Sequence, residues 1–563
     1  MKKTTAVAGL LATTLLGTVP CLNTANASSA DQTIEPRTLK VKSHVMDLSI
    51  IPAAPPKTQL PADWWQNAVF YQVFVRSFSD SNGDGHGDIQ GLIDKLDYIE
   101  ALGVRGIWLM PMTLSHFHTN GYAVVDHRKL ETDYGEMKDF QRLLEEAHKR
   151  DIGIIVDYVM NHAGVSNPLF RAVTYGRNQE YKNWFVWRPD NPGWTRWDGR
   201  QVWHGIRSGE HYYGVFWSLL PDFNLKNPDV LEYHYSSMRY WLNMGVDGFR
   251  FDAVKQFVEN GASAQEDQPE TLAILKDVQA LVKSYDNTYM VCEAPGQSTL
   301  YSGDEACGSA FSFRFGNDLI RSVKHGRAAG SLAENYWHRT ERPYTNIATL
   351  LANHDPFAGK RLMEQFSDDE ARYKLAATLL LTHPGQPFVY YGEEIGMRHV
   401  RNESNKDFAL RGPMSWQANK QNGGFTEGRP YRGLATNVMT HNVAMQEADP
   451  NSLLNTYREL IKLRNNNPAL QNTAPLTVLT ESGDKVAMYL RQSATQTLLV
   501  VVNLDDDETS ISLADATKRA KSTGDWHPIY TSAEALNTGE ALSANSEITL
   551  PPLSATVLEL KPN

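Results

Sequence analysis

Short apolar runs alternate with longer segments of helical spacing from about Trp64 onward. The short runs are rich in β-branched and aromatic residues, which is typical of strands, and the longer segments are amphipathic. Strands that alternate with helices predict βα units and a parallel sheet. The predicted strands are residues 68–75, 106–110, 152–157, 248–252, 289–293, 348–353 and 386–390, and the predicted helices are 92–102, 140–149, 231–244 and 271–283.

The number of these units predicts the fold class. Close to eight units over about 400 residues indicate an α/β fold, a (β/α)₈ barrel with insertions, because a bare barrel takes about 250 residues. The C-terminal part differs, since β-rich runs at 486–490, 497–502 and 555–560 are separated by turns. We expect a small antiparallel β-sandwich there.

These patterns divide the 563 residues into successive parts. We expect a signal peptide at 1–27, an N-terminal extension or linker at 28–63, the barrel at 64–162 and 222–472, an inserted domain at 163–221, and the β-sandwich at 473–563. A chain of this length can form two or three domains and bury a large core without cross-links.

The first part of the chain predicts export. Two lysines precede an apolar stretch at residues 6–19, and Ala-Asn-Ala at 25–27 offers a cleavage site between small residues, as in a secretory signal peptide. The apolar stretch is too short for a comfortable membrane span. A lipid anchor on Cys21 is a weaker alternative, because Pro20 precedes it. We expect a mature protein in the periplasm or secreted, without a membrane span.

Charge and cysteine content restrict the partners and the cross-links. The formal net charge is −11, which argues against a nucleic-acid partner, because no basic surplus is present to meet phosphates. After cleavage of the leader, only Cys292 and Cys307 remain. They could form one disulfide in an oxidising compartment, or Cys292 could stay free and buried. The sequence leaves both alternatives open.

A carboxylate follows the apolar run at four predicted strand ends. The four segments read IVDYVMNH at 155–162, GFRFDAVK at 248–255, MVCE at 290–293 and LANHD at 351–355. One such acid is usually a solvated charge or a helix cap. Four of them at the face of a barrel where catalytic residues lie indicate a functional site, because clustered like charges destabilise a fold that does not use them.

These four segments resemble the signature regions of the α-amylase family of glycoside hydrolases, glycoside hydrolase family 13. The resemblance extends over residues 68–470 in the right order, and further matches are Gly-Tyr at 121–122, LPDFN at 220–224 and GQPFVYYGEEIG at 385–396. It implies a secreted or periplasmic bacterial member of the family. It also implies a barrel with a domain inserted after the third strand and a C-terminal β domain.

The resemblance implies roles for the three aligned carboxylates. Asp252 aligns with the nucleophile, Glu293 with the acid/base, and Asp355 with a third acid that holds ring hydroxyls of the substrate. Retaining hydrolysis needs one ionised carboxylate to attack and one protonated carboxyl to release the leaving group. We expect Arg250 to keep Asp252 ionised, and we expect Asp252 and Asp355 to raise the pKa of Glu293. The substrate-binding residues that the resemblance implies are Tyr122, His162, Arg250 and His354.

A second group of oxygen side chains lies in the segment DSNGDGHGD at 80–88. Oxygen side chains at alternate positions resemble the first half of an EF-hand loop, but Gly91 stands in place of the closing Glu. Some members of the resembled family bind Ca²⁺ with such a loop after the first barrel strand. We therefore expect Ca²⁺ as a cofactor, and a metal-free turn is the alternative. The expected ligands are Asp80, Asn82, Asp84, Asp88 and the main-chain carbonyl of His86.

Three positions depart from the family pattern. Gln256 stands where many members have a His that contributes to a further Ca²⁺ site, which puts that site in doubt. Ala123 stands where exo-acting glucosidases often have an Asp that grips the terminal glucose, which favours an open cleft. Ala253 follows the expected nucleophile, where members that prefer α-1,6 bonds tend to have Val, so α-1,4 bonds are favoured.

The favoured interpretation is retaining hydrolysis of α-1,4-glucosidic bonds in starch-derived maltooligosaccharides, which are short α-glucans. The alternative is an α-glucosidase, or a glucosyl transferase or isomerase of the trehalose-synthase type, acting on small α-glucosides through the same covalent intermediate. A non-catalytic carbohydrate-binding protein is a remote third hypothesis, because such relatives lose carboxylates that this chain retains.

The inserted segment is rich in aromatic residues. Some of them must fill a core, and others could be platforms for glucose rings, since apolar sugar faces stack on aromatic ones. The sequence does not assign which of them are platforms. They are Trp184, Trp187, Trp194, Trp197, Trp203, Tyr212, Tyr213 and Trp217.

Overall fold

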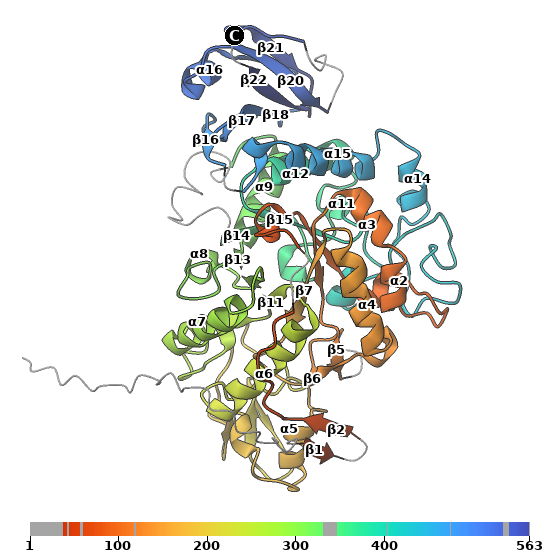
Figure 1. Cartoon of the computed structure of the whole chain (residues 1–563), viewed down its shortest axis with the longest axis vertical. Coiled ribbons are helices and arrows are strands. Elements are labelled where there is room, and N and C mark those ends of the chain that lie inside the picture. Colours follow the sequence, from red (N-terminus) through yellow and green to blue (C-terminus); the bar gives the residue numbers. More distant parts are fainter. Residues whose placement is uncertain are drawn as a thin grey trace, which may run out of the picture.

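The computed structural model describes most of the chain downstream of the expected leader. The described residues are 38–41, 44–56, 60–116, 120–329, 346–401, 403–472, 474–532 and 540–561. The expected signal peptide at 1–27 lies outside them. Figure 1 shows the barrel in the middle of the molecule, the C-terminal sheets at one end, and β1, β2 and α5 at the opposite end. Within the described residues, no helix combines the length and the apolar character needed to cross a membrane.

Eight parallel strands close into a barrel in the order in which they follow along the chain. They are β3 (Phe70–Val73), β4 (Gly106–Leu109), β7 (Gly153–Tyr158), β11 (Gly248–Phe251), β12 (Tyr289–Cys292), β13 (Ala310–Phe311), β14 (Ile347–Leu350) and β15 (Gln386–Tyr390). β15 pairs with β3 and completes the ring. The predicted (β/α)₈ fold class is confirmed. β13 was not predicted, because two residues are too few to show a pattern.

Helices cover the outside of the barrel, and most of them are amphipathic. The longer ones are α4 (Met137–His148), α6 (Pro228–Met244), α7 (Pro269–Lys283), α9 (Phe313–His325), α12 (Glu370–Thr382) and α15 (Leu453–Asn466), and two shorter ones, α2 (Ile89–Ile93) and α3 (Leu96–Leu102), replace the single helix predicted at 92–102. Among them, α12 is buried along most of its length. The start and the end of α6 have local causes. Asn227 caps its N-terminus, Pro228 occupies its first turn, and Gly245 ends it with φ of +104°.

Aromatic rings fill the interior of the barrel. Phe70 stacks on Phe388 at 4.5 Å between ring centroids, and Phe311 meets Phe388 edge-on at 4.9 Å. Trp64 covers the N-terminal end, where Gly153 begins β7. A Cβ on Gly153 would lie 2.3 Å from the Trp64 ring, so only glycine fits there. The N-terminal end is therefore sealed, and the carboxyl ends of the strands remain for a site.

The chain leaves the barrel between β7 and α6, as the predicted insertion. This segment contains α5 (Pro168–Thr174) and an antiparallel sheet of β8 (Trp187–Arg188), β10 (His211–Tyr213) and β9 (Trp203–Gly205). The segment returns at Asp222, which forms a β-bridge with His162. Its exit and its re-entry are therefore adjacent, and both lie beside a predicted site residue.

The C-terminal part forms two antiparallel sheets that share one apolar core. The larger sheet contains β16 (Leu476–Val478), β17 (Val486–Gln492), β18 (Thr497–Asn503), β22 (Ala555–Lys561) and β20 (Asp525–Thr531), and the smaller contains β19 (Thr509–Ser512) and β21 (Glu547–Leu550). Leu499, Trp526 and Ile548 come from both sheets and pack together. The predicted antiparallel β-sandwich is confirmed.

Part of the N-terminal extension packs against the barrel. It forms the hairpin β1 (Thr38–Val41) and β2 (His44–Asp47), and Met46 is fully buried. The Ile51 N–H then donates to Ser236 Oγ and the Ala54 N–H to Asn243 Oδ1, and both acceptors lie on α6. The described part of the segment predicted as an extension or linker is therefore an extension that packs against α6.

Candidate active site

The carboxyl ends of adjacent strands bring the predicted site residues together. Asp157 and Arg250 lie within β7 and β11, Asp252 and Glu293 directly follow β11 and β12, and Asp355 precedes the short helix η6 (Pro356–Ala358). Asp252, Glu293 and Asp355 line one cavity of about 740 Å³. The three carboxylates expected to carry the chemistry therefore face the same space.

Arg250 lies at the centre of this group and is completely buried. Its Nη1 donates to Asp157 Oδ1 at 2.7 Å and to Asp252 Oδ1 at 2.8 Å, and its Nη2 donates to Glu293 Oε2 at 2.6 Å. One planar guanidinium thus fixes three carboxylates relative to one another. The sequence placed Arg250 among the substrate-binding residues. The structure places it behind the cavity wall, where it acts on the carboxylates.

Burial is the largest influence on the pKa of each acid in the group. It raises the pKa of Asp157 and of Asp252 to about 6, and that of Glu293 and of Asp355 to about 7. The charge of Arg250 opposes the rise at Asp252 and at Glu293, and the charge of Asp252 adds to the rise at Glu293. The expected rise at Glu293 is present, but its main cause is burial and not the neighbouring acids.

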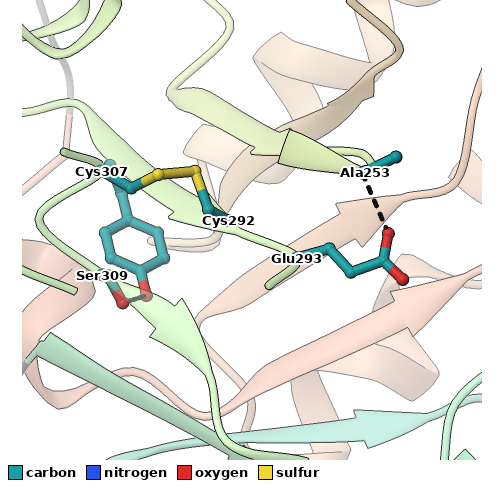
Figure 2. The surroundings of a disulfide bond; sticks show 6 residues. Ala253, Cys292, Glu293, Cys307 and Ser309 are labelled. Carbon is teal, nitrogen blue, oxygen red and sulfur yellow. Dashed lines mark hydrogen bonds between the residues drawn. A yellow bond between two sulfur atoms is a disulfide. The ribbon is translucent and has the colours of Figure 1, made fainter. Parts of the chain in front are cut away.

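Ala253 contacts Glu293 through an unusual main-chain conformation. Its φ of 50° and ψ of 39° are in the left-handed region, which costs a non-glycine residue roughly 1 kcal/mol. In this conformation the Ala253 N–H donates to Glu293 Oε2 at 3.2 Å, as Figure 2 shows. The turn after the predicted nucleophile thus helps to hold the predicted acid/base.

A disulfide joins Cys292 and Cys307, with 6.1 Å between their Cα atoms. Cys292 is the last residue of β12 and directly precedes Glu293, so the bond lies next to the site (Figure 2). The sequence had left the pairing open. The loop that the disulfide closes includes Pro295, which lines the cavity. The bond therefore ties part of the cavity wall to a barrel strand.

His354 and Tyr122 form a stacked pair beside Asp355. Their rings are parallel with centroids 5.5 Å apart, and His354 Nε2 lies 2.5 Å from Tyr122 Oη and 3.2 Å from Asp355 Oδ2. Tyr122 Oη also donates to Asp157 Oδ2 at 3.1 Å. Tyr122 lines the cavity, whereas His354 is fully buried behind it.

Both predicted histidines are held neutral by burial. Burial lowers the pKa of His162 to about 4 and lowers the pKa of His354 well below its ordinary value. His162 lines the cavity, and its Nε2 lies 3.1 Å from the Tyr122 main-chain oxygen. Neither ring adds a positive charge near neutral pH, and the ion pairs of the acids are formed by Arg250 and Arg411.

Arg411 is a site residue that the sequence did not indicate. Its Nη2 donates to Asp355 Oδ1 at 3.0 Å, its Nε donates to the His354 main-chain oxygen at 3.1 Å, and it lines the cavity. Gln72 was also missed, and its Nε2 lies 2.7 Å from His354 Nδ1. A single Arg outside the signature segments and a Gln inside a strand give no pattern that could have marked them.

The predicted calcium loop folds as a series of tight turns. Asp80 Oδ1 accepts from the N–H groups of Asn82 and Gly83, Asn82 Oδ1 accepts from Asp84, and Asp84 Oδ1 accepts from His86. Asp88 instead caps α2 by accepting from the Gly91 N–H at 2.6 Å. Over the described residues, no three His, Cys, Asp or Glu side chains converge as a metal site.

Comparison with known proteins gives one family. The alpha amylase catalytic domain family matches residues 72–473. Alpha-amylase 3 of Dictyoglomus thermophilum is 32% identical over 469 residues, which are 81% of this chain and 88% of that protein. An α-amylase structure from H. orenii superposes with a TM-score of 0.77 at 32% identity, covering 88% of this chain and 100% of that one.

Other relatives have different names. The probable oligo-1,6-glucosidase 2 of Bacillus subtilis is 29% identical over 528 residues, which are 80% of this chain and 92% of that protein. The trehalose synthase/amylase of Mycobacterium tuberculosis is 32% identical over 504 residues, which are 79% of this chain and 83% of that protein. The similarity thus extends to proteins named for amylase, glucosidase and synthase activities.

Proposed function

Because the chain belongs to the α-amylase family of glycoside hydrolases, we propose that it cleaves α-glucosidic bonds of small α-glucosides with retention of configuration and passes the glucosyl group to water or to a second sugar. The observation that carries this proposal is the arrangement of Asp252 and Glu293 on one buried guanidinium at the wall of a cavity. Such a pair of carboxyl groups is what a double displacement needs.

In the first step, the ionised Asp252 attacks the anomeric carbon and forms a glucosyl ester. Glu293 gives its proton to the leaving oxygen as the glycosidic bond breaks. In the second step, the Glu293 carboxylate takes a proton from water or from a sugar hydroxyl, whose oxygen attacks the same carbon and releases Asp252. The pKa values of about 6 for Asp252 and about 7 for Glu293 support this division of roles.

Asp355 and Tyr122 are suited to hold the sugar at the cleaved bond. Arg411 and His354 contact Asp355 from two sides, so its carboxylate is oriented before the substrate arrives. We assign Asp355 to the ring hydroxyls, Tyr122 to the apolar face of the ring, and His162 to a further hydroxyl. A carboxylate in a buried setting binds hydroxyl groups strongly, because little water competes for them.

The names of the relatives support small α-glucosides more than starch fragments alone, since oligo-1,6-glucosidase and trehalose synthase occur beside α-amylase. A second candidate is hydrolysis of α-1,4 bonds in maltooligosaccharides. It is favoured by Ala123, which is buried and brings no acid to the site, and by Ala253, which lines the cavity.

Product analysis tests the proposal. Purified protein would be incubated with maltose, isomaltose, trehalose, sucrose and maltoheptaose, and the anomers released would be followed by NMR. We expect α-configured products from at least one disaccharide, and transfer products at high sugar concentration. Asp252→Asn should abolish turnover while the circular dichroism spectrum and the melting temperature stay close to those of the wild type. Inversion of configuration, or turnover of maltoheptaose only, would contradict the proposal.

We also propose that the loop at 80–88 binds Ca²⁺. Its donors are oxygens only, and they include the carboxylates of Asp80, Asp84 and Asp88, which suits a hard cation. Bound Ca²⁺ would join this loop to α2, whose N-terminus Asp88 caps. Titration of chelator-treated protein with Ca²⁺ should raise the melting temperature. The double variant Asp80→Asn, Asp84→Asn should lose that increase, and a similar increase in both proteins would contradict the site.

We propose further that the protein acts outside the cytoplasm. The disulfide between Cys292 and Cys307 supports this location, because such bonds persist in oxidising compartments. Fractionation of cells that express the full chain, with immunoblotting for the processed form, tests it. Protein that stays unprocessed in the cytoplasm would contradict export.

A further inference from the structure

Three large aromatic side chains at the cavity are unusually exposed. Trp197 is 62% exposed, Trp217 is 55% exposed and Phe357 is 51% exposed, and all three line the cavity that holds the carboxylates. Several other aromatic residues of the insertion are packed, as with Trp187 stacked on Phe170. Exposed apolar surface that gathers at one cavity is typical of a ligand site.

Trp197 is held in place by its neighbours. The guanidinium of Arg196 lies 5.0 Å from the centre of its ring. Arg196 in turn pairs with Asp198 at 2.5 Å and donates to the Phe216 main-chain oxygen at 3.1 Å. One face of the ring is thus covered by a fixed cation. A ring that is already positioned loses little freedom when a ligand stacks on its open face.

Phe216 neighbours both Trp197 and the predicted substrate-binding residue His162. The Phe216 ring lies 5.4 Å from His162 and 6.3 Å from Trp197, and Trp217 follows next in the chain. Lys255 and Glu266 line the same cavity and form an ion pair at 3.1 Å. Aromatic faces together with a few polar groups are the combination that binds sugar rings.

We propose that Trp197 and Trp217 form a platform for a glucosyl ring other than the one attacked by Asp252. This inference rests on the proposed function and deepens it, because it makes the length of the α-glucoside a determinant of catalytic efficiency. A neutral ring would place its apolar C–H face on the indoles and its hydroxyls toward water or the Lys255–Glu266 pair. Arg196 is a positioning residue for this platform.

The test compares a substrate with one ring to a substrate with seven. α-Glucosyl fluoride offers a single glucose ring, and maltoheptaose offers further rings for the platform. We expect Trp197→Ala and Trp217→Ala each to lower kcat/KM for maltoheptaose about 10-fold, mainly through KM, which is close to the effect of losing one stacked ring. The value for α-glucosyl fluoride should change less than about 2-fold.

Tyr175→Ala is the matched control. Tyr175 is 60% exposed on the same inserted segment but does not line the cavity, so its variant should behave as the wild type with both substrates. Equal losses for both substrates in the tryptophan variants, or no loss for either, would overturn the platform. Inactivity of the wild type toward every α-glucoside would instead contradict the proposed function.

A binding measurement keeps the two proposals separate. Maltoheptaose would be titrated calorimetrically into Asp252→Asn, with and without Trp197→Ala. We expect the dissociation constant to rise about 10-fold when Trp197 is removed. An unchanged constant would overturn the platform whether or not the wild type turns over substrate.

Discussion

Arg250 determines how many of the buried acids of the site can be ionised at the same time. One guanidinium carries a single positive charge, but it contacts Asp157, Asp252 and Glu293. If all three were ionised, two negative charges would remain unbalanced in a buried place, which is costly. One proton on the group therefore stabilises it near neutral pH. Glu293 has the highest pKa of the three, so it is the acid that keeps this proton.

The pH dependence of catalysis follows from these pKa values. Asp252 must be ionised to attack, and its pKa is about 6, so activity should rise as the pH increases through 6. Glu293 must be protonated, and its pKa is about 7, so activity should fall as the pH increases through 7. We expect a narrow bell-shaped profile of kcat/KM for maltose, with its maximum between these values.

Glu293→Gln provides the control for this profile. Fluoride leaves without a proton, so the variant should still react with α-glucosyl fluoride, and its kcat/KM should show only the limb that belongs to Asp252. With maltose the same variant should lose about 100-fold or more in kcat/KM, since general acid catalysis contributes roughly 10² to 10⁴. An alkaline limb that persists with α-glucosyl fluoride would assign it to another group.

Residues with a recognisable motif could be predicted, and residues that act on them could not. Asp252 and Glu293 follow apolar runs within signature segments, so their convergence could be expected from the barrel alone. Arg411 reaches Asp355 from a polar stretch without periodicity, and nothing in its surroundings along the chain indicates this contact. The exposure of Trp197 also depends on packing, since Trp203 in the same aromatic-rich segment is buried.

Helices and strands could be predicted where the order of apolar and polar residues along the chain indicates which side chains are buried. The barrel strands from β3 to β12 consist mainly of apolar residues, because both faces of a barrel strand are covered. The docked extension at 44–56 has no such pattern, since its main-chain N–H groups bind Ser236 and Asn243 on α6. Docking through the backbone leaves no periodicity in the sequence, and the segment therefore looked like an extension or linker.

The disulfide should stabilise the loop that follows β12. It joins residues 15 apart, and closing a loop of that size contributes about 3 kcal/mol by restricting the unfolded chain. Cys307→Ser should lower the free energy of unfolding by about that amount in urea titrations. Reduction of the wild type should have the same effect, and reduction of the variant should have none. Equal midpoints for oxidised and reduced wild type would contradict this role.

At the scale of the whole molecule, two buried arginines bind the C-terminal end of α12, and one of them, Arg491, connects the barrel to the C-terminal sandwich. Arg464 on α15 donates to the main-chain oxygens of Leu381, His383 and Gly385, and Arg491 on β17 donates to that of Thr382. These carbonyls lie at and just beyond the C-terminal end of α12, where unsatisfied carbonyls and the helix dipole favour a cation. The order of the domains could be predicted from the sequence, but this contact could not. Every residue has a main-chain carbonyl, so the residue types along the chain do not indicate which carbonyls an arginine binds.

Arg491→Met should therefore weaken the attachment of the sandwich more than its fold. The side chain also donates to the Gln471 and Ala474 main-chain oxygens, so its loss leaves several buried acceptors unsatisfied and should cost roughly 2 to 4 kcal/mol. We expect calorimetry to show a separate transition for the sandwich at lower temperature. Lys561→Met is the control, because Lys561 is a mostly exposed residue of the same domain whose contact with Glu559 spans 3.9 Å, worth less than about 1 kcal/mol. A single unshifted transition for Arg491→Met would contradict this coupling.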